Sequence, residues 1–287
     1  MARPAAQGPE VASPGRLAGK RARLEEVLRD LRGVVVAFSG GVDSAYLLAA
    51  AHDVLGDRCA GATAVSPSLA RDELDSARRL AAAIGVRHIV VETEEYEDPR
   101  YRQNDAHRCY FCKHALFTRL GALAAELDLP CVAYGANVDD LGDWRPGMRA
   151  AREFAVRAPL LDAGFTKSEI RALARARGLA AWDKPASPCL ASRIPHGTPV
   201  TFRALRQIEE GERILHGLGF REVRVRHHGD VARVEVPLEE IARLQEIAPQ
   251  FTAAFRAVGF REVIVDPRGL RSGALALGPG APGEPQQ

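Results

Sequence analysis

The sequence predicts an α/β fold: a doubly wound parallel sheet followed by a small C-terminal α+β domain. Over the first half of the chain, short apolar runs alternate with longer helical patterns, which is typical of parallel βαβ units with right-handed crossovers. One strand-to-helix junction carries a glycine-rich hexapeptide at 39–44. Towards the C-terminus the pentapeptide Gly-Phe-Arg-Glu-Val occurs at 219–223 and again at 259–263, each time after a helical pattern, which indicates a separate smaller domain.

The elements of the first half follow from hydrophobic spacing. A helix over 20–32 carries apolar residues at helical intervals, and the apolar run 33–38 after it is the expected first strand. A second helix at 42–55 ends before a glycine that can stop it. The same patterns place strands at 59–65, 87–92 and 131–135 and helices at 68–84 and 109–127. Because ligands bind at the carboxyl ends of parallel strands, the loops after these strands should share one crevice.

Beyond residue 184 the pattern changes. An irregular, proline-rich stretch at 184–198 suggests an inter-domain loop. After it, helices are expected at 202–218 and 238–258, and short strands at 223–227, 231–236 and 263–265. We therefore predict a disordered tail at 1–19, a nucleotide-binding domain at 20–183, a cysteine-containing loop at 184–199, an α+β domain at 200–273 and a second disordered tail at 274–287.

Composition narrows the function. With 287 residues, 46% of them hydrophobic, the chain can bury the cores of about two domains. A net charge of +2 gives no general signal for a polyanionic partner, so we expect no nucleic-acid binding. Neither a membrane-length apolar run nor a secretory signal is evident, and we expect a cytoplasmic protein. In that compartment the five cysteines are thiols or metal ligands rather than disulfides.

The hexapeptide is the first candidate site. A strand, a glycine turn and a helix in succession place backbone N–H groups and a helix N-terminus on a phosphate. The motif has neither the Lys-Ser/Thr ending of a Walker A loop nor the three spaced glycines of a dinucleotide loop. Glycines allow close approach of the main chain, hydroxyls offer hydrogen bonds, and Asp43 could hold Mg²⁺ directly or through water. The candidate phosphate-binding residues are Ser39, Gly40, Gly41, Val42, Asp43 and Ser44.

The stretch 135–149, after the fourth strand, is rich in carboxylates and arginines. At that edge of the sheet Asp139 or Asp140 could also hold Mg²⁺, and Arg145 or Arg149 could bind phosphate or carboxylate oxygens. A solvated polar loop is the alternative interpretation.

Three of the cysteines form the second candidate site. Cys109 and Cys112 make a C-x-x-C at the start of a helix, and Cys189 lies in the proline-rich loop. A redox dithiol would need a thioredoxin-like context, which is absent. The three thiols with His107 or His114 could instead bind structural zinc, or the thiols alone could hold a [4Fe–4S] cluster with one open iron. Spacing does not choose between these. Cys59 and Cys131 lie in apolar strands and are expected to pack in the core.

Arginines of the second domain are the third candidate. Alternation along the strands places Arg224 and Arg226 on one face, and Arg233 with Glu235 on one face of the next strand. Arg271 follows the last strand. Such a set suits a phosphate or carboxylate of a substrate, or it is a solvated sheet face.

Together these motifs resemble the LarE-type ATP-dependent sulfur transferases. The hexapeptide alone resembles the pyrophosphate loop of the ATP pyrophosphatase (PP-loop) superfamily, which includes GMP synthetase, NAD synthetase and tRNA thiolation enzymes. The added features are Asp-x-Arg-Pro-Gly at 143–147, the cysteine loop at 184–197 and Arg-Ser-Gly at 271–273. The resemblance covers about 20–275 and implies an adenine nucleotide alpha-hydrolase-like fold.

The resemblance further implies a reaction. With ATP and Mg²⁺, such an enzyme adenylates a carboxylate of pyridinium-3,5-biscarboxylic acid mononucleotide and replaces the carboxylate oxygen by sulfur, for the nickel-pincer cofactor of lactate racemase. In one version a cysteine matching Cys189 is sacrificed; in the other it joins a C-x-x-C to hold a [4Fe–4S] cluster. Since Cys109, Cys112 and Cys189 are all present, the cluster version is favoured, with Lys184 or Arg193 neutralising charge near Cys189. A homo-oligomer and an external sulfide source are also implied.

Two other functions fit part of the sequence. A tRNA 2-thiolation enzyme can combine this ATP loop with three cysteines, but it needs a basic RNA-binding face, and the chain has no Lys/Arg-rich run. A nucleotide-binding regulator without catalysis would bind ATP but would release no pyrophosphate in the presence of the pyridinium substrate.

Overall fold

The computed structural model describes residues 14–142 and 146–270, which form two compact units. The first unit takes in the chain up to Val65 together with Arg71–Thr93 and Lys113–Ala186. The second takes in Ser66–Ala70, Glu94–Cys112 and the chain from Ser187 onwards. Arg145, Arg271, the predicted C-terminal tail and most of the predicted N-terminal tail lie outside the described residues. The predicted domain limits stay a prediction.

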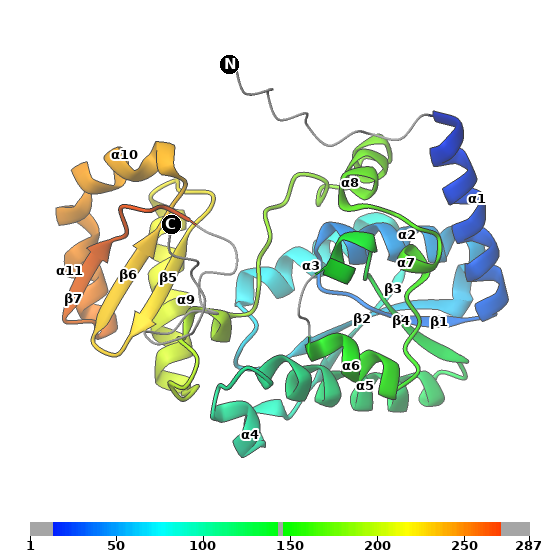
Figure 1. The fold of residues 1–287 in the computed structure, drawn as a ribbon, viewed down its shortest axis with the longest axis horizontal. Coiled ribbons are helices and arrows are strands. Elements are labelled where there is room, and N and C mark those ends of the chain that lie inside the picture. Colours follow the sequence, from blue (N-terminus) through cyan, green and yellow to red (C-terminus); the bar gives the residue numbers. More distant parts are fainter. Residues whose placement is uncertain (1–13, 143–145, 271–287) are drawn as a thin grey trace, which may run out of the picture. The chain divides into compact units, whose positions relative to one another are not determined.

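The first unit is built on a four-stranded sheet, with its strands in the order β3-β2-β1-β4 (Figure 1). All of its pairings are parallel, as the alternation of strands and helices predicts. The strands are β1 (Val34–Ala37), β2 (Cys59–Val65), β3 (Arg87–Glu92) and β4 (Cys131–Tyr134).

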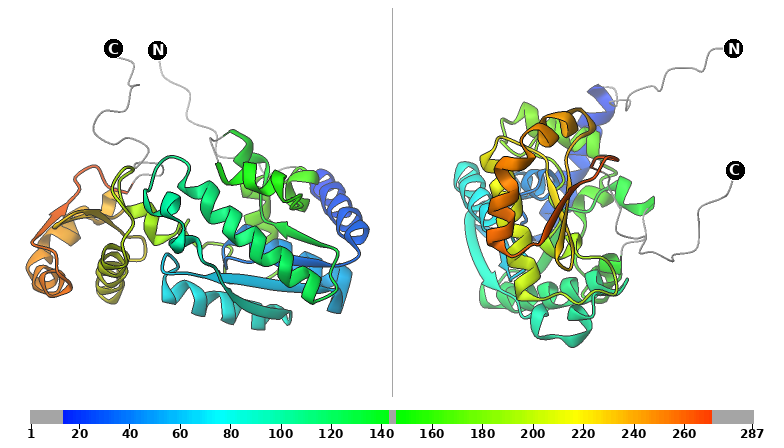
Figure 2. Two further views of the ribbon diagram at one scale, coloured as in Figure 1. Left: turned by 90° about the horizontal axis from the view of Figure 1, so that it is seen from below. Right: turned by 90° about the vertical axis from the view of Figure 1, so that its left-hand side faces the viewer.

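Helices cover both faces of this sheet, because alternate side chains of β1 point to opposite sides. Val34 and Val36 pack in a core with α1, α2 and α3, whereas Val35 packs with Leu120 and Leu123 of α5. Figure 1 shows α2 and α3 on one side of the sheet and α5 on the other, and the left view of Figure 2 shows α5 lying across it. The predicted doubly wound parallel sheet is therefore confirmed. These helices are α1 (Pro14–Leu31), α2 (Val42–Leu55), α3 (Arg71–Ile84) and α5 (Arg108–Glu126).

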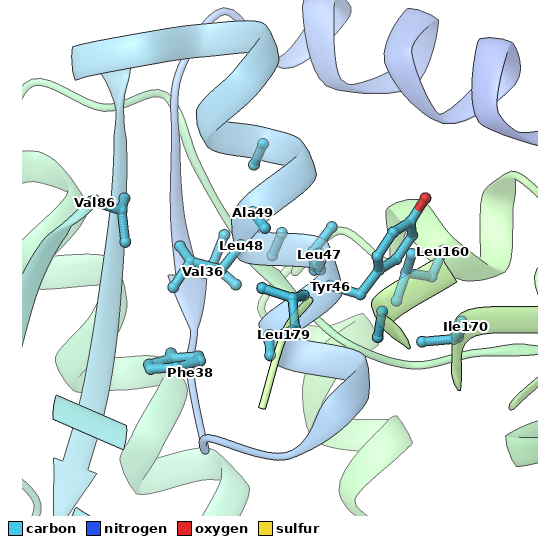
Figure 3. Close-up of a cluster of buried hydrophobic side chains, with 14 of the residues drawn as sticks. Val36, Phe38, Tyr46, Leu47, Leu48, Ala49, Val86, Leu160, Ile170 and Leu179 are labelled. Carbon is cyan, nitrogen blue, oxygen red and sulfur yellow. The ribbon is translucent and has the colours of Figure 1, made fainter. Parts of the chain in front are cut away.

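Helix α2 is the centre of the larger core (Figure 3). Its side chains Tyr46, Leu47 and Leu48 lie between β1 and the later helices, which contribute Leu160 and Ile170. Burial around most of its circumference holds the N-terminus of α2 in place, so the hexapeptide before it has a rigid base. The later helices, which the sequence analysis did not predict, are α6 (Pro146–Glu153), α7 (Pro159–Asp162) and α8 (Lys167–Ala176).

The second unit contains a three-stranded sheet in the order β5-β6-β7, in which β5 and β6 are antiparallel and β6 and β7 are parallel. Its repeated pentapeptide has a structural explanation: Gly219 and Gly259 both adopt positive φ after a helix, and the next residues, Phe220 and Phe260, are buried in the same core. The predicted α+β fold is confirmed. Its strands are β5 (Arg224–His228), β6 (Val231–Glu235) and β7 (Glu262–Val265), and its helices include α9 (Phe202–Gly217), α10 (Ile241–Glu246) and α11 (Ala248–Val258).

Three helices differ most from the predictions. Helix α1 begins at Pro14 rather than at residue 20, because Leu17 extends the apolar stripe that packs on the core. Helix α3 begins at Arg71, since Ser68 is held elsewhere by a hydrogen bond with Tyr101. The single helix expected at 238–258 is wrong: α11 starts anew with Pro249 in its first turn, where the missing N–H of proline costs no hydrogen bond.

An ion pair joins α1 to α8. The Lys20 ammonium lies 2.6 Å from Glu169 Oε2, and the Glu169 side chain is only 3% exposed. Burial by itself would raise the pKa of the Glu169 carboxyl, but hydrogen bonds from Lys20 and Thr166 outweigh burial and lower it. Because the pKa in the folded state lies below that in the unfolded chain, this pair stabilises the fold at neutral pH and the contribution is lost as the pH falls through the lowered pKa.

We therefore expect Glu169→Gln to reduce the free energy of unfolding at neutral pH by about 2 kcal/mol, less than for a fully buried pair because Lys20 reaches solvent. The difference from the unsubstituted chain should be smaller at acidic pH than at neutral pH, because Glu169 itself becomes protonated as the pH falls through its lowered pKa. Urea unfolding at both pH values measures it. Glu25→Gln, which removes an exposed pair with Arg29, is the control and should change little. Equal losses in the two variants would contradict the prediction.

Candidate functional site

The hexapeptide connects β1 to α2 as a turn closed by its own side chains. The Ser39 and Ser44 hydroxyls lie 3.2 Å apart, and Ser44 Oγ also donates to the Gly41 carbonyl at 3.0 Å. Gly40 has φ +73°, which glycine adopts without strain, and a Cβ there would lie 3.2 Å from the Cβ of Ala77. Conformation and space both require glycine at this position.

The first turn of α2 is open to an anion. Gly41 is its N-cap, in extended conformation, and no side chain caps the helix. The first backbone N–H groups of a helix have no intrahelical partner, and they carry the positive end of the helix dipole. Val42 is buried and Asp43 is partly exposed, so main-chain amides and one carboxylate face this turn. The arrangement suits the binding of phosphate oxygens.

The strand order places this turn at the switch point of the sheet. β1 pairs with β2 on one side and with β4 on the other, so the crevice opens beyond the carboxyl ends of β1 and β4. Gly135, which follows β4, approaches the turn closely: a Cβ on it would lie 2.8 Å from the Ser44 nitrogen and 3.0 Å from the Asp43 carbonyl carbon. The sequence prediction that the loops after β1 and β4 lie together is confirmed.

We expect Gly135→Ala to cost about 1–3 kcal/mol of stability, because the added methyl group must push the Asp43–Ser44 backbone away. The displaced turn should also bind ATP more weakly. Urea unfolding and equilibrium ATP binding measure the two effects. Gly121→Ala is a matched control, since a Cβ there meets nothing within 4 Å in α5 and the helix should gain about 0.5–1 kcal/mol. An unaltered ATP affinity in Gly135→Ala would show that the turn tolerates the shift.

A polar cluster surrounds Asp43. Its carboxylate forms an ion pair with the Lys167 ammonium and accepts a hydrogen bond from Asn137 Nδ2 at 3.4 Å. Asp139, predicted with Asp43 as a magnesium ligand, accepts a hydrogen bond from the backbone nitrogen of Lys167 at 2.5 Å. The structure thus brings Asp43 and Asp139 to the same residue, at the N-terminus of α8. Asp140 turns back and accepts from the Asn137 nitrogen at 2.9 Å.

The carboxylate oxygens of Asp43 and Asp139 are of the type that Mg²⁺ prefers. In this structure Lys167 neutralises Asp43, so a divalent ion there would displace the ammonium group. Sequence reasoning missed Lys167 and Asn137. A signal for Lys167 existed: Thr166 and Glu169 form a capping box, which marks the start of a helix.

Lys184 and Arg149 are engaged elsewhere in the first unit. The Lys184 ammonium pairs with Glu73 of α3 at 2.6 Å, and Arg149 pairs with Glu153 within α6 at 3.5 Å. Neither contact involves the hexapeptide.

The three thiols of the second candidate site all belong to the second unit. Cys109 and Cys112 lie in the first turn of α5, and Cys189 precedes the short 3₁₀ helix η4 (Leu190–Arg193). None of the three forms a disulfide within the described residues; Cys109 and Cys189 are exposed and Cys112 is half-buried. Each cysteine of the C-x-x-C shares a buried neighbour with Cys189: Arg108 is common to Cys109 and Cys189, and Tyr101 is common to Cys112 and Cys189.

The pKa values of these two buried side chains reflect the thiols near them. Burial would lower the pKa of the Arg108 guanidinium, but the adjacent Cys189 and Cys109 thiols raise it. The pKa of Tyr101 is raised by burial and then by Cys189 and Cys112. Sulfur from cysteine side chains is the donor type that holds iron–sulfur clusters. The donor types therefore fit an iron–sulfur cluster, although no group of three or more His, Cys, Asp or Glu side chains within 14–142 and 146–270 is arranged to hold a metal ion.

The remaining cysteines are core residues. Cys59 is 1% exposed, and burial raises its pKa to about 12. Cys131 packs against the same core, burial raises its pKa, and its Sγ donates to the Gly33 carbonyl at 3.4 Å. His114, a candidate zinc ligand, contacts the Phe154 ring edge-on.

Two arginines of the third candidate site, Arg224 and Arg226, are buried, as is Arg193 of the cysteine loop. Arg226 pairs with Glu235 at 2.8 Å, and Arg193 pairs with Glu212 at 2.9 Å. Burial lowers the pKa of Arg224, with smaller contributions from Arg226 and Arg193. The alternative of a solvated sheet face is therefore wrong for Arg224 and Arg226, because they line the interior of the second unit.

These arginines also hold the cysteine loop. Arg193 Nη1 donates to the Pro188 carbonyl at 2.5 Å and to the Cys189 carbonyl at 3.3 Å, and Arg226 donates to the Ser192 carbonyl at 3.1 Å. Arg233 pairs with Asp266 at 2.9 Å. Arg193, predicted to act near Cys189, thus reaches its backbone, and sequence reasoning missed Glu212 as its partner.

Across the described part of the chain, no helix combines the length and the apolar character that a membrane span needs.

Comparison with known proteins agrees with this geometry. The asparagine synthase family matches residues 23–110. The pyridinium-3,5-bisthiocarboxylic acid mononucleotide synthase of Lactiplantibacillus plantarum is 37% identical over 90% of this chain and 94% of its own. The uncharacterized protein slr1717 of Synechocystis is 41% identical over 90% of this chain and 97% of its own. The tRNA-specific 2-thiouridylase MnmA of Caulobacter vibrioides is 29% identical over 86% of this chain and 74% of its own.

The synthase covers nearly the whole chain, including both units, and confirms the resemblance drawn from the sequence motifs. The chain belongs to the LarE-type family of ATP-dependent sulfur transferases, within the PP-loop superfamily.

Proposed function

We propose that this enzyme adenylates a carboxylate of pyridinium-3,5-biscarboxylic acid mononucleotide and converts it to a thiocarboxylate, as a step towards the nickel-pincer cofactor of lactate racemase. The observation that carries the proposal is the combination of an open pyrophosphate turn in one unit with three thiols in the other, of which those of Cys109 and Cys189 lie beside a buried guanidinium. Activation of an oxygen and its replacement by sulfur need these two kinds of site.

In the first half-reaction, a carboxylate oxygen of the substrate attacks the α-phosphorus of ATP. The bond between the α-phosphorus and the bridging oxygen breaks, and pyrophosphate leaves with the electron pair. The amides of the first turn of α2 and the Ser39 and Ser44 hydroxyls bind its oxygens. Asp43 and Asp139 would hold Mg²⁺, which would supply charge compensation for the leaving group. Lys167, released from Asp43, is then available to the phosphates.

In the second half-reaction, a sulfur nucleophile attacks the acyl carbon and AMP leaves. Cys109, Cys112 and Cys189 would hold a [4Fe–4S] cluster, which would supply sulfide at its open iron. The residues of the chain orient this site: Arg193 and Arg226 fix the loop that carries Cys189, and Arg108 lies beside the thiols. If Cys189 is sacrificed instead, its Sγ attacks the acyl carbon, and loss of the Cα proton with cleavage of the Cβ–S bond leaves the thiocarboxylate and dehydroalanine.

We assign the substrate phosphate to the arginine cluster. This cluster consists of Arg193, Arg224 and Arg226, whose guanidinium groups lie in the interior of the second unit. Arg233, Arg145 and Arg271 are further proposed contacts. A guanidinium group presents several N–H donors in a fixed planar arrangement, which matches the oxygens of a phosphate monoester.

Anaerobic purification followed by iron and sulfide analysis tests the sulfur site, and mass spectrometry of the pyridinium product with a pyrophosphate assay tests the reaction. We expect pyrophosphate release and thiocarboxylate formation to depend on the pyridinium substrate. If the purified protein contains zinc and no iron, the proposed iron–sulfur cluster is excluded. If the mass of the protein falls after one turnover by the mass of one hydrogen sulfide molecule, Cys189 is the sacrificed sulfur donor. Binding of ATP without release of pyrophosphate would instead support the alternative of a nucleotide-binding regulator without catalysis.

A tRNA 2-thiolation activity is the second candidate, because 2-thiouridylases are among the relatives. A mobility shift with tRNA that is tight and weakens steeply with salt would favour it. A homo-oligomer is also proposed, and sedimentation measures it.

A further inference from the structure

Asn104 is a buried residue that is hydrogen-bonded to both segments that carry the thiols of the second unit, the cysteine loop and the start of α5. It follows helix α4 (Pro99–Arg102), is 0% exposed and has φ +57°, a conformation that asparagine tolerates better than most residues. Its side-chain Nδ2 lies 3.3 Å from the Ile194 carbonyl, 2.9 Å from that of Pro195 and 2.8 Å from that of Thr198. One amide group thus holds three carbonyls of the cysteine loop.

The backbone carbonyl and the side-chain oxygen of Asn104 also accept hydrogen bonds. Its backbone carbonyl accepts a hydrogen bond from the Gly197 nitrogen at 3.0 Å. Its side-chain oxygen accepts one from Arg108 Nη1, and that nitrogen also donates to the Ala191 carbonyl at 2.7 Å. Because Arg108 directly precedes Cys109 and Ala191 follows Cys189 by two residues, this network connects the start of α5 to the cysteine loop.

Apolar packing reinforces the connection. Leu190, Ala191 and Ile194 are buried against Tyr101, and Cys112 packs on the edge of the same cluster. The Leu190 nitrogen donates to the Ser68 carbonyl at 2.9 Å. The residue after Cys189 is therefore held by its backbone and its side chain, whereas Cys189 itself is exposed. The loop is ordered although its thiol is free to react.

We propose that Asn104 is the positioning residue of the sulfur site: its buried amide fixes the loop of Cys189 against the start of α5, and so keeps Cys189 near the C-x-x-C before any metal or substrate binds. This inference depends on the proposed function in one respect, which is that the three thiols take part in sulfur transfer. A flexible loop would have to be ordered on each encounter with metal or substrate, and preorganisation removes that cost.

The test uses metal-free, reduced full-length protein and dibromobimane, a short reagent that becomes fluorescent when both of its arms have reacted with thiols. Peptide mapping gives the ratio of links from Cys189 to the C-x-x-C over links between Cys109 and Cys112. The second kind of link lies within one helical turn and serves as an internal reference. Asn104→Gly removes the amide but keeps the positive φ accessible. Gln103→Gly, which changes the exposed neighbouring residue, is the matched control.

We expect the unsubstituted chain and Gln103→Gly to give the same ratio, and Asn104→Gly to lower it about tenfold, because a released loop loses the high effective concentration of its thiol. If Asn104→Gly does not fold, Asn104→Asp replaces it; that side chain has the same shape but no N–H donors for the three carbonyls. A folded Asn104 variant with an unchanged ratio would overturn the proposal, as would a failure of the unsubstituted chain to form links from Cys189. A normal link pattern in a protein that makes no thiocarboxylate would instead overturn the proposed function.

Discussion

Cys189→Ala is expected to abolish thiocarboxylate formation while substrate-dependent release of pyrophosphate continues. The contacts that hold this loop use the backbone of Cys189 and its neighbours, so loss of the exposed thiol should leave the loop in place. Both routes for sulfur require this side chain, as a ligand or as a donor, and removal of an essential nucleophile or ligand costs about 10³-fold or more in rate. Mass spectrometry of the product and a coupled pyrophosphate assay measure the two half-reactions on one sample.

Cys131→Ala is the matched control for that experiment. Its thiol lies in β4, where it packs against the core and donates to a carbonyl, so its loss should cost some stability and leave sulfur transfer intact. Full thiocarboxylate formation by Cys189→Ala would exclude both sulfur routes. A parallel loss of pyrophosphate release would show that the cysteine also serves the first half-reaction.

Asp43→Asn is expected to reduce pyrophosphate release by about 10²–10³-fold, because the substitution removes the anionic oxygen that would hold Mg²⁺ at the leaving group. The amide has nearly the same shape as the carboxylate, so the turn between β1 and α2 should keep its geometry. The substitution also removes the carboxylate that pairs with the Lys167 ammonium, and the side chain at position 43 keeps its neutral neighbour Asn137. Steady-state pyrophosphate release as a function of Mg²⁺ concentration is the measurement.

Asp53→Asn controls for the loss of one negative charge on the same helix. Asp53 lies near the other end of α2 and pairs with Arg177 on the surface. It should leave the rate and the dependence on Mg²⁺ unchanged. Equal rates of pyrophosphate release for Asp43→Asn and the unsubstituted enzyme would show that Asp43 is not needed to hold Mg²⁺. Asp139 would then be the remaining proposed Mg²⁺ ligand.

Much of the fold follows from local pattern. Apolar runs and helical spacing predicted each strand of the parallel sheet, and the glycine-rich turn predicted where its ligand edge lies. The errors have local causes as well. The helix expected at 238–258 is interrupted near Pro249, and the helices between β4 and the cysteine loop were missed although Thr166 and Glu169 mark the start of one.

The sequence by itself determined the type of sheet, the pyrophosphate turn and the identity of the three thiols, since each depends on residues close together in the chain. The tertiary structure alone decided the partners of those residues. Lys167 reaches Asp43 across 124 positions, and Asn104 holds carbonyls 90 to 94 positions later. Such pairs arise from the packing of distant elements, and hydrophobic periodicity carries no information about them. Burial of Arg224 and Arg226 is of the same kind: alternation placed them on one face, and only the packed core shows that this face is the interior.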